Sequence, residues 1–208
     1  MKISMKIYIF SGAFLLLFGL SVFYIFFTDA NITNYPPKNN VIVAFGDSLV
    51  FGQGATVDND FVSVLSRSLG RDIINLGVSG NTTVDGLARM KEVTALDPGV
   101  VILLLGGNDY LRRISKEETK ANLEVLIKTF VDDGSVVVLL GVRGGVIRDG
   151  RKDMYRELSA EYGTVYVSDV LDGILLKPEL MSDGVHPNDA GYSRIAERIH
   201  KAFLTSKL

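Results

Sequence analysis

The sequence predicts an α/β fold in which a parallel sheet is covered by helices on both faces. Short runs rich in Val and Ile alternate with segments of helical periodicity, the pattern of strands joined by helical crossovers. The apolar runs are mostly unbroken by polar residues, as expected for strands buried on both faces. Polar, glycine-containing stretches follow several of these runs, at the edge where such sheets bind ligands.

The elements alternate from residue 41 to the end of the chain. Strands are predicted at 41–45, 72–76, 100–105, 135–142 and 164–168. Helices are predicted near 59–69, 83–95, 115–132, 150–162 and 188–204. The helix at 115–132 has the clearest signals, because Ser115 and Glu118 are spaced as a capping box and Gly134 follows the last turn.

Composition indicates one globular domain and excludes several functions. The chain has 208 residues, 47% of them hydrophobic, and a net charge of -2. It has no basic run, which argues against binding to nucleic acid. It also has no cysteine, so a thiolate nucleophile, a disulfide framework and a cysteine zinc site are excluded. No pattern specifies an oligomeric state, and no metal or cofactor is expected.

Residues 1–30 form a separate N-terminal segment. Residues 7–27 carry no charge and, as a helix, extend about 31 Å, the thickness of a bilayer's hydrocarbon core. Lys2 and Lys6 precede this stretch, so the positive-inside rule places the rest of the chain across the membrane. The sequence predicts an uncleaved anchor, with a cleaved secretory signal as the alternative. Residues 31–40 are predicted to be a linker, and residues 41–208 the catalytic domain.

Ser48 is the candidate nucleophile because the stretch "FGDSL" places it directly after the first strand. A serine hydroxyl needs a base, usually a histidine oriented by a carboxylate. His200 lies on the apolar face of the last helix, which leaves His186, with Asp183 three residues before it. Ser48, His186 and Asp183 are predicted to form a catalytic triad. Pro187 is expected at the first position of the last helix, and capping of that helix is the alternative role for Asp183 and His186.

An ester hydrolase also needs hydrogen-bond donors for the oxyanion of its tetrahedral intermediate. Three are predicted by position: the N–H groups of Ser48 and Gly77 and the side-chain amide of Asn108. Gly77 lies in "NLGVSGNTT" after the second strand and Asn108 in "LGGNDY" after the third. The alternative is that the glycines serve only as turn residues after the strands.

These motifs resemble the four blocks of the SGNH (GDSL) hydrolase family. The blocks are "FGDSL", "NLGVSGNTT", "GGND" and "DGVHPN", in that order, within residues 41–203. The chain is most similar to the thioesterase I, lysophospholipase and arylesterase group of small exported bacterial proteins. The resemblance implies a three-layer α/β/α flavodoxin-like fold with a central five-stranded parallel sheet, and it gives the predicted triad and oxyanion residues the same roles. That group usually carries a cleaved signal, from which the long apolar segment here departs.

The expected activity is hydrolysis of carboxylic ester or thioester bonds through an acyl-enzyme. Tyr110, Leu111 and Arg143 are expected to bind a small-molecule or lipid ester. The expected location is the bacterial cell membrane, with one span and the catalytic domain in the periplasm or otherwise outside the cytoplasm; secretion to the periplasm is the alternative. An O-acetyl esterase or an acyltransferase acting on cell-envelope glycans or lipids is a second functional hypothesis. A non-catalytic membrane-tethered binding protein on the same fold is a third.

Overall fold

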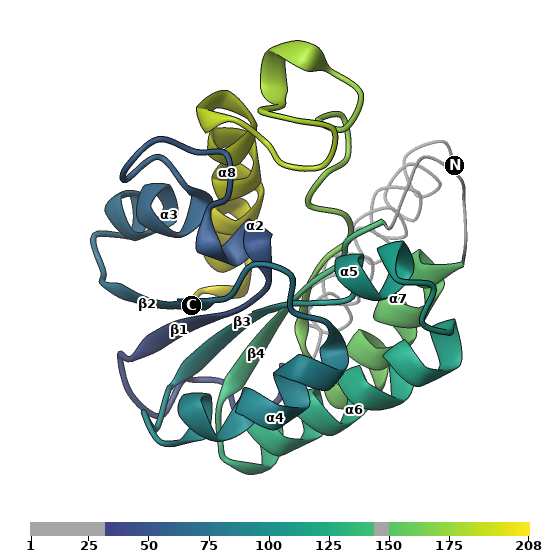
Figure 1. Cartoon of the computed structure of the whole chain (residues 1–208). Coiled ribbons are helices and arrows are strands. Elements are labelled where there is room, and N and C mark those ends of the chain that lie inside the picture. Colours follow the sequence, from purple (N-terminus) through teal and green to yellow (C-terminus); the bar gives the residue numbers. More distant parts are fainter. Residues whose placement is uncertain (1–31, 144–149) are drawn as a thin grey trace, which may run out of the picture. The chain divides into compact units, whose positions relative to one another are not determined.

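The computed structural model describes residues 32–143 and 150–208, and within them five strands form one parallel sheet (Figure 1). The strand order is β2-β1-β3-β4-β5, which is the flavodoxin-like order. The strands are β1 (Ile42–Gly46), β2 (Ile73–Gly77), β3 (Val100–Leu104), β4 (Val136–Leu140) and β5 (Val165–Val167). The predicted five-stranded parallel sheet is confirmed, and each strand overlaps the run that predicted it, with β1 and β2 ending one residue later than predicted.

Helices cover both faces of the sheet. They are α2 (Ser48–Phe51), α3 (Phe61–Leu69), α4 (Thr83–Thr94), α5 (Gly107–Leu111), α6 (Lys116–Asp132), α7 (Arg151–Tyr162) and α8 (Asp189–Ser206), with a 3-10 turn η1 (Pro178–Leu180). Helix α6 packs between α4 and α7 on one face, and α3 packs against α8 on the other (Figure 1). The five longer helices were predicted. The sequence analysis missed α2, α5 and η1, because elements this short show no helical periodicity.

The registers of the central strands bring three loops together at one edge of the sheet. Gly46, the last residue of β1, pairs with Gly77 of β2 on one side and with Leu104 of β3 on the other. Strands β1, β3 and β4 are buried along their whole length, whereas β2 is a partly exposed edge strand. The loops after β1, β2 and β3 therefore start side by side, at the carboxyl edge.

The last helix begins at Asp189, one residue after the predicted start at 188 and two residues after Pro187. Asn188 has an extended backbone, and its side chain accepts a hydrogen bond from the Gly191 N–H at 3.1 Å, so Asn188 is the N-cap of α8. Pro187 therefore precedes the cap, and its prediction as the first helical residue was wrong. Ser115 caps α6 as predicted, accepting from the Glu118 N–H at 3.1 Å.

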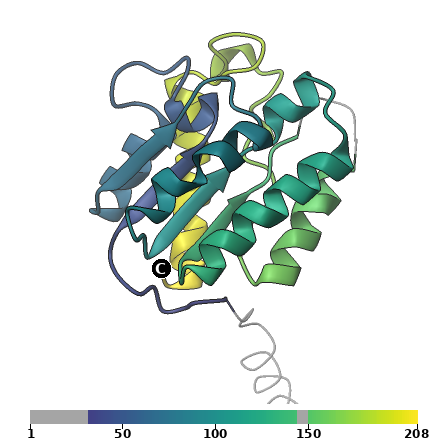
Figure 2. The same ribbon diagram turned by 60° about the horizontal axis from the view of Figure 1, so that its bottom comes forward.

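Residues 33–40, predicted as a linker, lie against the opposite, amino edge of the sheet. The Thr33 N–H donates to the carbonyl of Gly163 at 2.9 Å, in the loop before β5. The Asn34 side-chain amide donates to the carbonyl of Val131 at 2.7 Å, near the end of α6. Figure 2 shows this segment, in purple, crossing below the sheet. The folded domain therefore includes residues before β1.

The predicted membrane span at 7–27 lies outside the residues that the structure describes. Among residues 32–143 and 150–208, no helix combines the length and the apolar character needed to cross a bilayer.

Candidate active site

Ser48 is presented at the carboxyl end of β1 by a sharp change from strand to helix. Asp47 is the N-cap of α2, and its carboxylate accepts the Leu49 N–H at 3.0 Å, so Ser48 becomes the first residue of the helix. Gly46 lets the chain turn tightly beside β3, since a Cβ there would lie 2.2 Å from the Leu104 carbonyl oxygen. The Ser48 side chain thus stands at the sheet edge, although the residue is only 8% exposed.

The structure brings His186 and Asp183 to Ser48 from the other end of the chain. The His186 Nε2 lies 3.1 Å from the Ser48 Oγ, and the His186 Nδ1 lies 2.7 Å from the Asp183 Oδ2. The second carboxylate oxygen of Asp183 accepts the N–H groups of Val185 and His186, at 2.8 and 2.7 Å. The loop therefore holds the carboxylate still, and the carboxylate orients the imidazole toward the serine.

Hydrogen bonds keep Asp183 ionised in this position. The His186 side chain, followed by the backbone N–H of Val185, lowers the pKa of Asp183 from 3.8 to about 2. A carboxylate accepts a hydrogen bond from Nδ1–H, which leaves Nε2 as the proton acceptor that faces the serine.

Gly77 does not reach this site. It is the last residue of the edge strand β2, and its N–H donates to the Asn75 Oδ1 at 2.9 Å. Its Cα packs against the backbone of α2, where a Cβ would lie 2.1 Å from the Phe51 nitrogen. Gly77 also does not line the cavity in front of Ser48. Its predicted role as an oxyanion donor is therefore not supported by the geometry.

Gly80, three residues later in the same motif, lies where Gly77 was expected. It lines the cavity with Ser48 and Asn108, and its φ of +84° lies in the left-handed region that favours glycine. Within the described residues, the N–H groups of Ser48 and Gly80 donate no hydrogen bond. Asn108 donates one side-chain N–H to the carbonyl of Asn81 at 2.9 Å, which leaves its second N–H for the cavity. The sequence feature that could have pointed to Gly80 as the donor is its position two residues before Thr82, the N-cap of α4.

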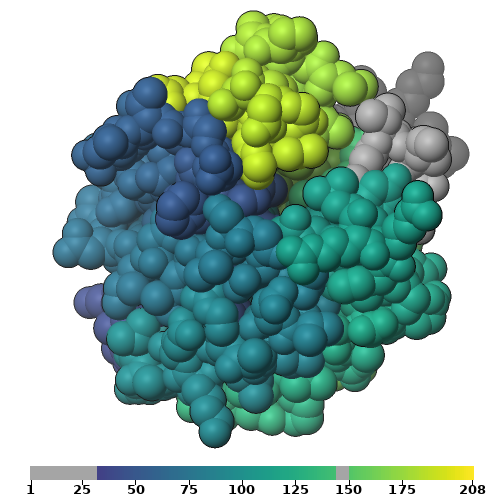
Figure 3. Space-filling model, viewed as in Figure 1, coloured from purple at the N-terminus to yellow at the C-terminus, as the bar shows by residue number. Residues whose placement is uncertain are grey.

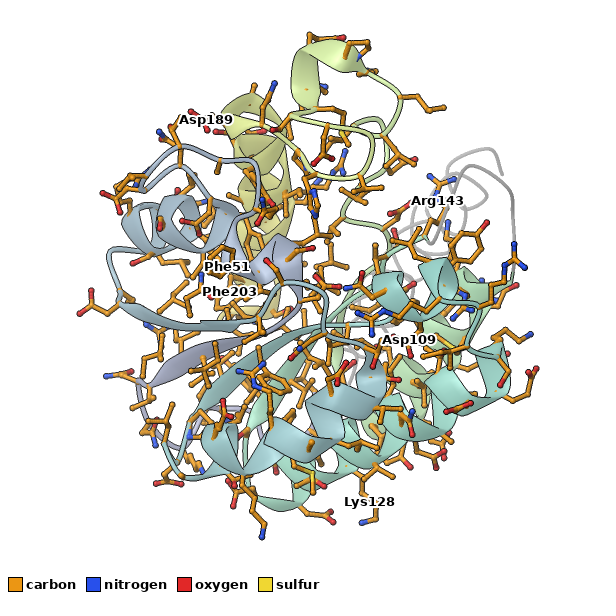
Figure 4. All side chains as sticks on the ribbon, in the orientation of Figure 1. Phe51, Asp109, Lys128, Arg143, Asp189 and Phe203 are labelled. Atoms are coloured by element: carbon orange, nitrogen blue, oxygen red, sulfur yellow. The ribbon has the colours of Figure 1, made fainter. Side chains whose placement is uncertain are left out.

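Two buried carboxyl groups flank the candidate site in the sequence: Asp47 directly precedes Ser48, and Asp109 directly follows Asn108. Asp47 is 2% exposed, and burial, with a smaller contribution from the nearby Asp109, raises its pKa from 3.8 to about 7. Asp109 is fully buried and accepts the N–H of Thr83 at 3.0 Å as well as the Thr83 hydroxyl. Asp109 belongs to α5 and is labelled in Figure 4. The sequence analysis did not single out either carboxyl group.

The cavity in front of Ser48 has a volume of about 400 Å³ and mostly apolar walls. Figure 3 views the face on which the segments near residues 50, 110 and 185 (dark blue, teal and yellow) meet. The apolar residues that line the cavity include Leu49, Leu111, Val142, Leu171, Leu175 and Val185. Leu111 therefore lies where substrate binding was predicted. Tyr110 does not line the cavity, because its ring faces away beneath the Arg151 guanidinium, 5.6 Å from the ring centre.

Arg143 reaches the cavity wall but is already paired. Its guanidinium forms ion pairs with Asp169 and Asp172, and the hydrogen bond to Asp169 is the main cause of its raised pKa. Figure 4 labels Arg143, which follows β4 on the carboxyl side of the sheet. Two carboxylates thus neutralise the positive charge of the Arg143 guanidinium, which was predicted to bind substrate. Within the described ranges, no group of three or more His, Asp or Glu side chains could hold a metal ion.

Comparisons with known proteins agree with this fold. The chain is 32% identical to an arylesterase of Vibrio mimicus over 170 residues, which cover 75% of this chain and 84% of the relative. It is 25% identical to thioesterase 1/protease 1/lysophospholipase L1 of Escherichia coli strain K12, over 78% of this chain and 82% of that protein. The crystal structure of TesA superposes with a TM-score of 0.74 at 28% identity, covering 80% of this chain and 99% of TesA.

The fold and these relatives define a carboxylic ester hydrolase of the SGNH class. The chain belongs to the GDSL-like lipase/acylhydrolase family, whose model matches residues 44–194. The matched region contains Ser48, Asn108 and His186 together with the sheet that positions them. The resemblance seen in the four sequence blocks is therefore confirmed.

Proposed function

We propose that the protein is a serine esterase that cleaves carboxylic ester or thioester bonds through a Ser48–His186–Asp183 triad. The observation that carries the proposal is the chain of two contacts, 3.1 Å from Ser48 to His186 and 2.7 Å from His186 to Asp183. His186 takes the Ser48 proton as the hydroxyl oxygen attacks the carbonyl carbon, and then gives that proton to the leaving alcohol or thiol. Water, activated by the same histidine, hydrolyses the acyl-enzyme and restores Ser48.

The negative oxygen of each tetrahedral intermediate is stabilised by three donors in this proposal. They are the N–H groups of Ser48 and Gly80 and the free side-chain N–H of Asn108. All three residues line the cavity, and neither backbone N–H has a partner among the described residues. Each such donor typically contributes about 100- to 1000-fold in rate, because it binds charge that exists only in the transition state.

The substrate proposed is an ester with an apolar acyl or aryl group and no anionic group near the reacting carbonyl. The leucine and valine walls of the cavity favour an apolar group, and the pairing of Arg143 with two carboxylates removes a binding partner for phosphate or carboxylate. The printed names of the relatives, an arylesterase and a thioesterase, fit this substrate class.

Replacement of Ser48 tests the proposal directly. We expect Ser48→Ala to abolish hydrolysis of p-nitrophenyl butyrate while leaving the circular dichroism spectrum and the thermal midpoint unchanged. Turnover in the variant at the wild-type rate would contradict the proposal. A series of p-nitrophenyl esters from acetyl to palmitoyl then measures the preferred acyl length. Added glycerol separates hydrolysis from transfer to an alcohol, and acetylated glycans test the O-acetyl esterase alternative.

We also propose that residues 7–27 anchor the enzyme in the bacterial cell membrane, with the catalytic domain outside the cytoplasm. The support is the uncharged length of this segment and the two lysines before it. The proposal predicts that the full chain stays with the membrane after a high-pH carbonate wash and that its N-terminal sequence begins at Met1. A mature protein that starts near Asn31 would show signal cleavage instead.

A further inference from the structure

Two of the three proposed oxyanion donors, Gly80 and Asn108, lie on elements that no strand pairing joins directly. Gly80 is in the loop between β2 and α4, and Asn108 is in α5 after β3. Strand β1 lies between β2 and β3 in the sheet. The distance between the two donors therefore depends on side-chain contacts between α5 and the loop that leads into α4.

Three residues of α5 and its end make those contacts. Asn108 donates to the carbonyl of Asn81 at 2.9 Å, and Arg112 donates to the carbonyl of Gly80 at 2.8 Å. The carboxylate of Asp109 accepts both the N–H and the hydroxyl of Thr83, the first residue of α4. The Arg112 contact is exposed to solvent, whereas Asp109 and Thr83 are both completely buried. The Asp109–Thr83 contact is thus the one that water does not weaken.

We propose that Asp109 is a positioning residue that sets the geometry of the oxyanion hole by joining α5 to the start of α4. This inference rests on the esterase mechanism proposed above. Asp109 follows Asn108 directly, and Thr83 lies three residues after Gly80, so the contact fixes both donors through short, rigid pieces of backbone. Asp109 does not line the cavity and so acts on the reaction only through its neighbours.

The position of the charge explains why an aspartate is needed here. A buried carboxylate requires hydrogen-bond donors, and Asp109 has the Thr83 N–H, the Thr83 hydroxyl and the Thr119 hydroxyl at 3.4 Å. The Thr83 N–H belongs to the first turn of α4, where N–H groups have no acceptor within the helix itself. The helix dipole also favours a negative charge at this end. A neutral side chain would hold α4 less firmly.

The test measures kcat and KM separately in the full chain with p-nitrophenyl butyrate. We expect Asp109→Asn to lower kcat about 100-fold, the typical effect of a displacement of about 1 Å at a reacting group, with little change in KM. Asn122→Ala is the matched control. It removes a 3.0 Å hydrogen bond to the same Thr83 hydroxyl but leaves the contact between α5 and α4 in place, so we expect wild-type kcat. Wild-type kcat in Asp109→Asn would overturn the proposal.

A double-mutant cycle separates positioning from a general loss of stability. If Asp109 acts through the oxyanion hole, Asp109→Asn lowers kcat much less in an Asn108→Ala background than in the wild type. Full additivity of the two effects would overturn the proposal. If Asp109→Asn fails to fold, Thr83→Val takes its place, because it removes the hydroxyl and keeps the N–H. A lower kcat at unchanged KM supports the inference, and an unchanged kcat overturns it. Activity that survives Ser48→Ala would instead refute the esterase mechanism itself.

Discussion

At the scale of single residues, Asp47 shows how the turn that presents the nucleophile changes the chemistry of a carboxyl group. It caps α2 and lines the cavity beside Ser48, yet it is 2% exposed and lies near the second buried carboxyl group, Asp109. Burial, with a smaller contribution from Asp109, raises its pKa to about 7, so Asp47 binds a proton more tightly in the folded than in the unfolded chain. The stability of the domain must then depend on pH in this range.

The pH dependence has a defined sign. The contribution of Asp47 is fully present below pH 4 and is lost as the pH rises through about 7, because folding then has to bury a charge. The shift corresponds to about 4 kcal/mol at most. We expect urea unfolding of the wild type to show a falling free energy of unfolding between pH 4 and pH 7, relative to Asp47→Asn, which keeps an acceptor for the Leu49 N–H. Parallel curves for the two proteins would contradict this.

At the scale of elements, the contact between β2 and α2 explains why the second strand ends in a glycine. The Cα of Gly77 packs directly against the backbone around Val50 and Phe51. The side chain of Asn75 closes the same contact, since its amide donates to the Val50 carbonyl at 2.7 Å and its Oδ1 accepts the Gly77 N–H. Gly77 thus holds the helix that carries Ser48 and takes no part in binding the oxyanion.

A side chain at Gly77 should therefore destabilise the domain. A Cβ there would lie 2.1 Å from the Phe51 nitrogen, so α2 or β2 must move. We expect Gly77→Ala to lower the free energy of unfolding by about 1 to 3 kcal/mol, the usual effect of overpacking. Gly184→Ala is the stability control, because nothing lies within 4 Å of its added Cβ. Equal thermal midpoints for the two variants would argue against a close contact at Gly77.

At the scale of the whole domain, the two edges of the sheet have separate tasks. The carboxyl edge carries Ser48, Asn108 and the cavity, whereas residues 33–40 lie across the amino edge. A strand of five residues is about 17 Å long, so the N-terminal segment of the domain is well separated from the reacting groups. The described chain therefore enters the domain at the edge opposite the reacting groups.

Loss of the contacts at the amino edge should affect stability without affecting catalysis. The Asn34 amide donates to the carbonyls of Val131 and Ser135, at 2.7 and 3.0 Å, and its backbone has a φ of +64°, which asparagine tolerates better than alanine. We expect Asn34→Ala to lower stability by about 1 to 3 kcal/mol, with kcat and KM unchanged below the melting range. Tyr35→Phe is the control, because it removes only a 3.4 Å exposed contact. A large fall in kcat would show that the edges are coupled.

Much of the fold and part of the site follow from local sequence. The runs of apolar residues in β1, β3 and β4 reflect burial on both faces of the sheet. Ser115 and Gly134 mark the two ends of a helix. Both kinds of pattern can be recognised in the sequence without knowledge of the tertiary structure. Ser48, Asp183 and His186 were predicted because few side chains can perform the chemistry. The short helices α2 and α5 could not be predicted, since one turn of helix is stabilised by its neighbours rather than by its own periodicity.

The sequence by itself determined the succession of strands and helices along the chain, the choice of Ser48 and His186 as candidate nucleophile and base, and the family. Only the tertiary structure decided which glycine faces the cavity, that Arg143 is paired with Asp169 and Asp172, and that Asp109 joins α5 to α4. The physical reason is the range of the interactions. Periodicity and capping act over a few residues, whereas the carboxylate of Asp109 meets Thr83, which is 26 residues away. The N–H of Gly80 is available because no acceptor within the described residues lies next to it.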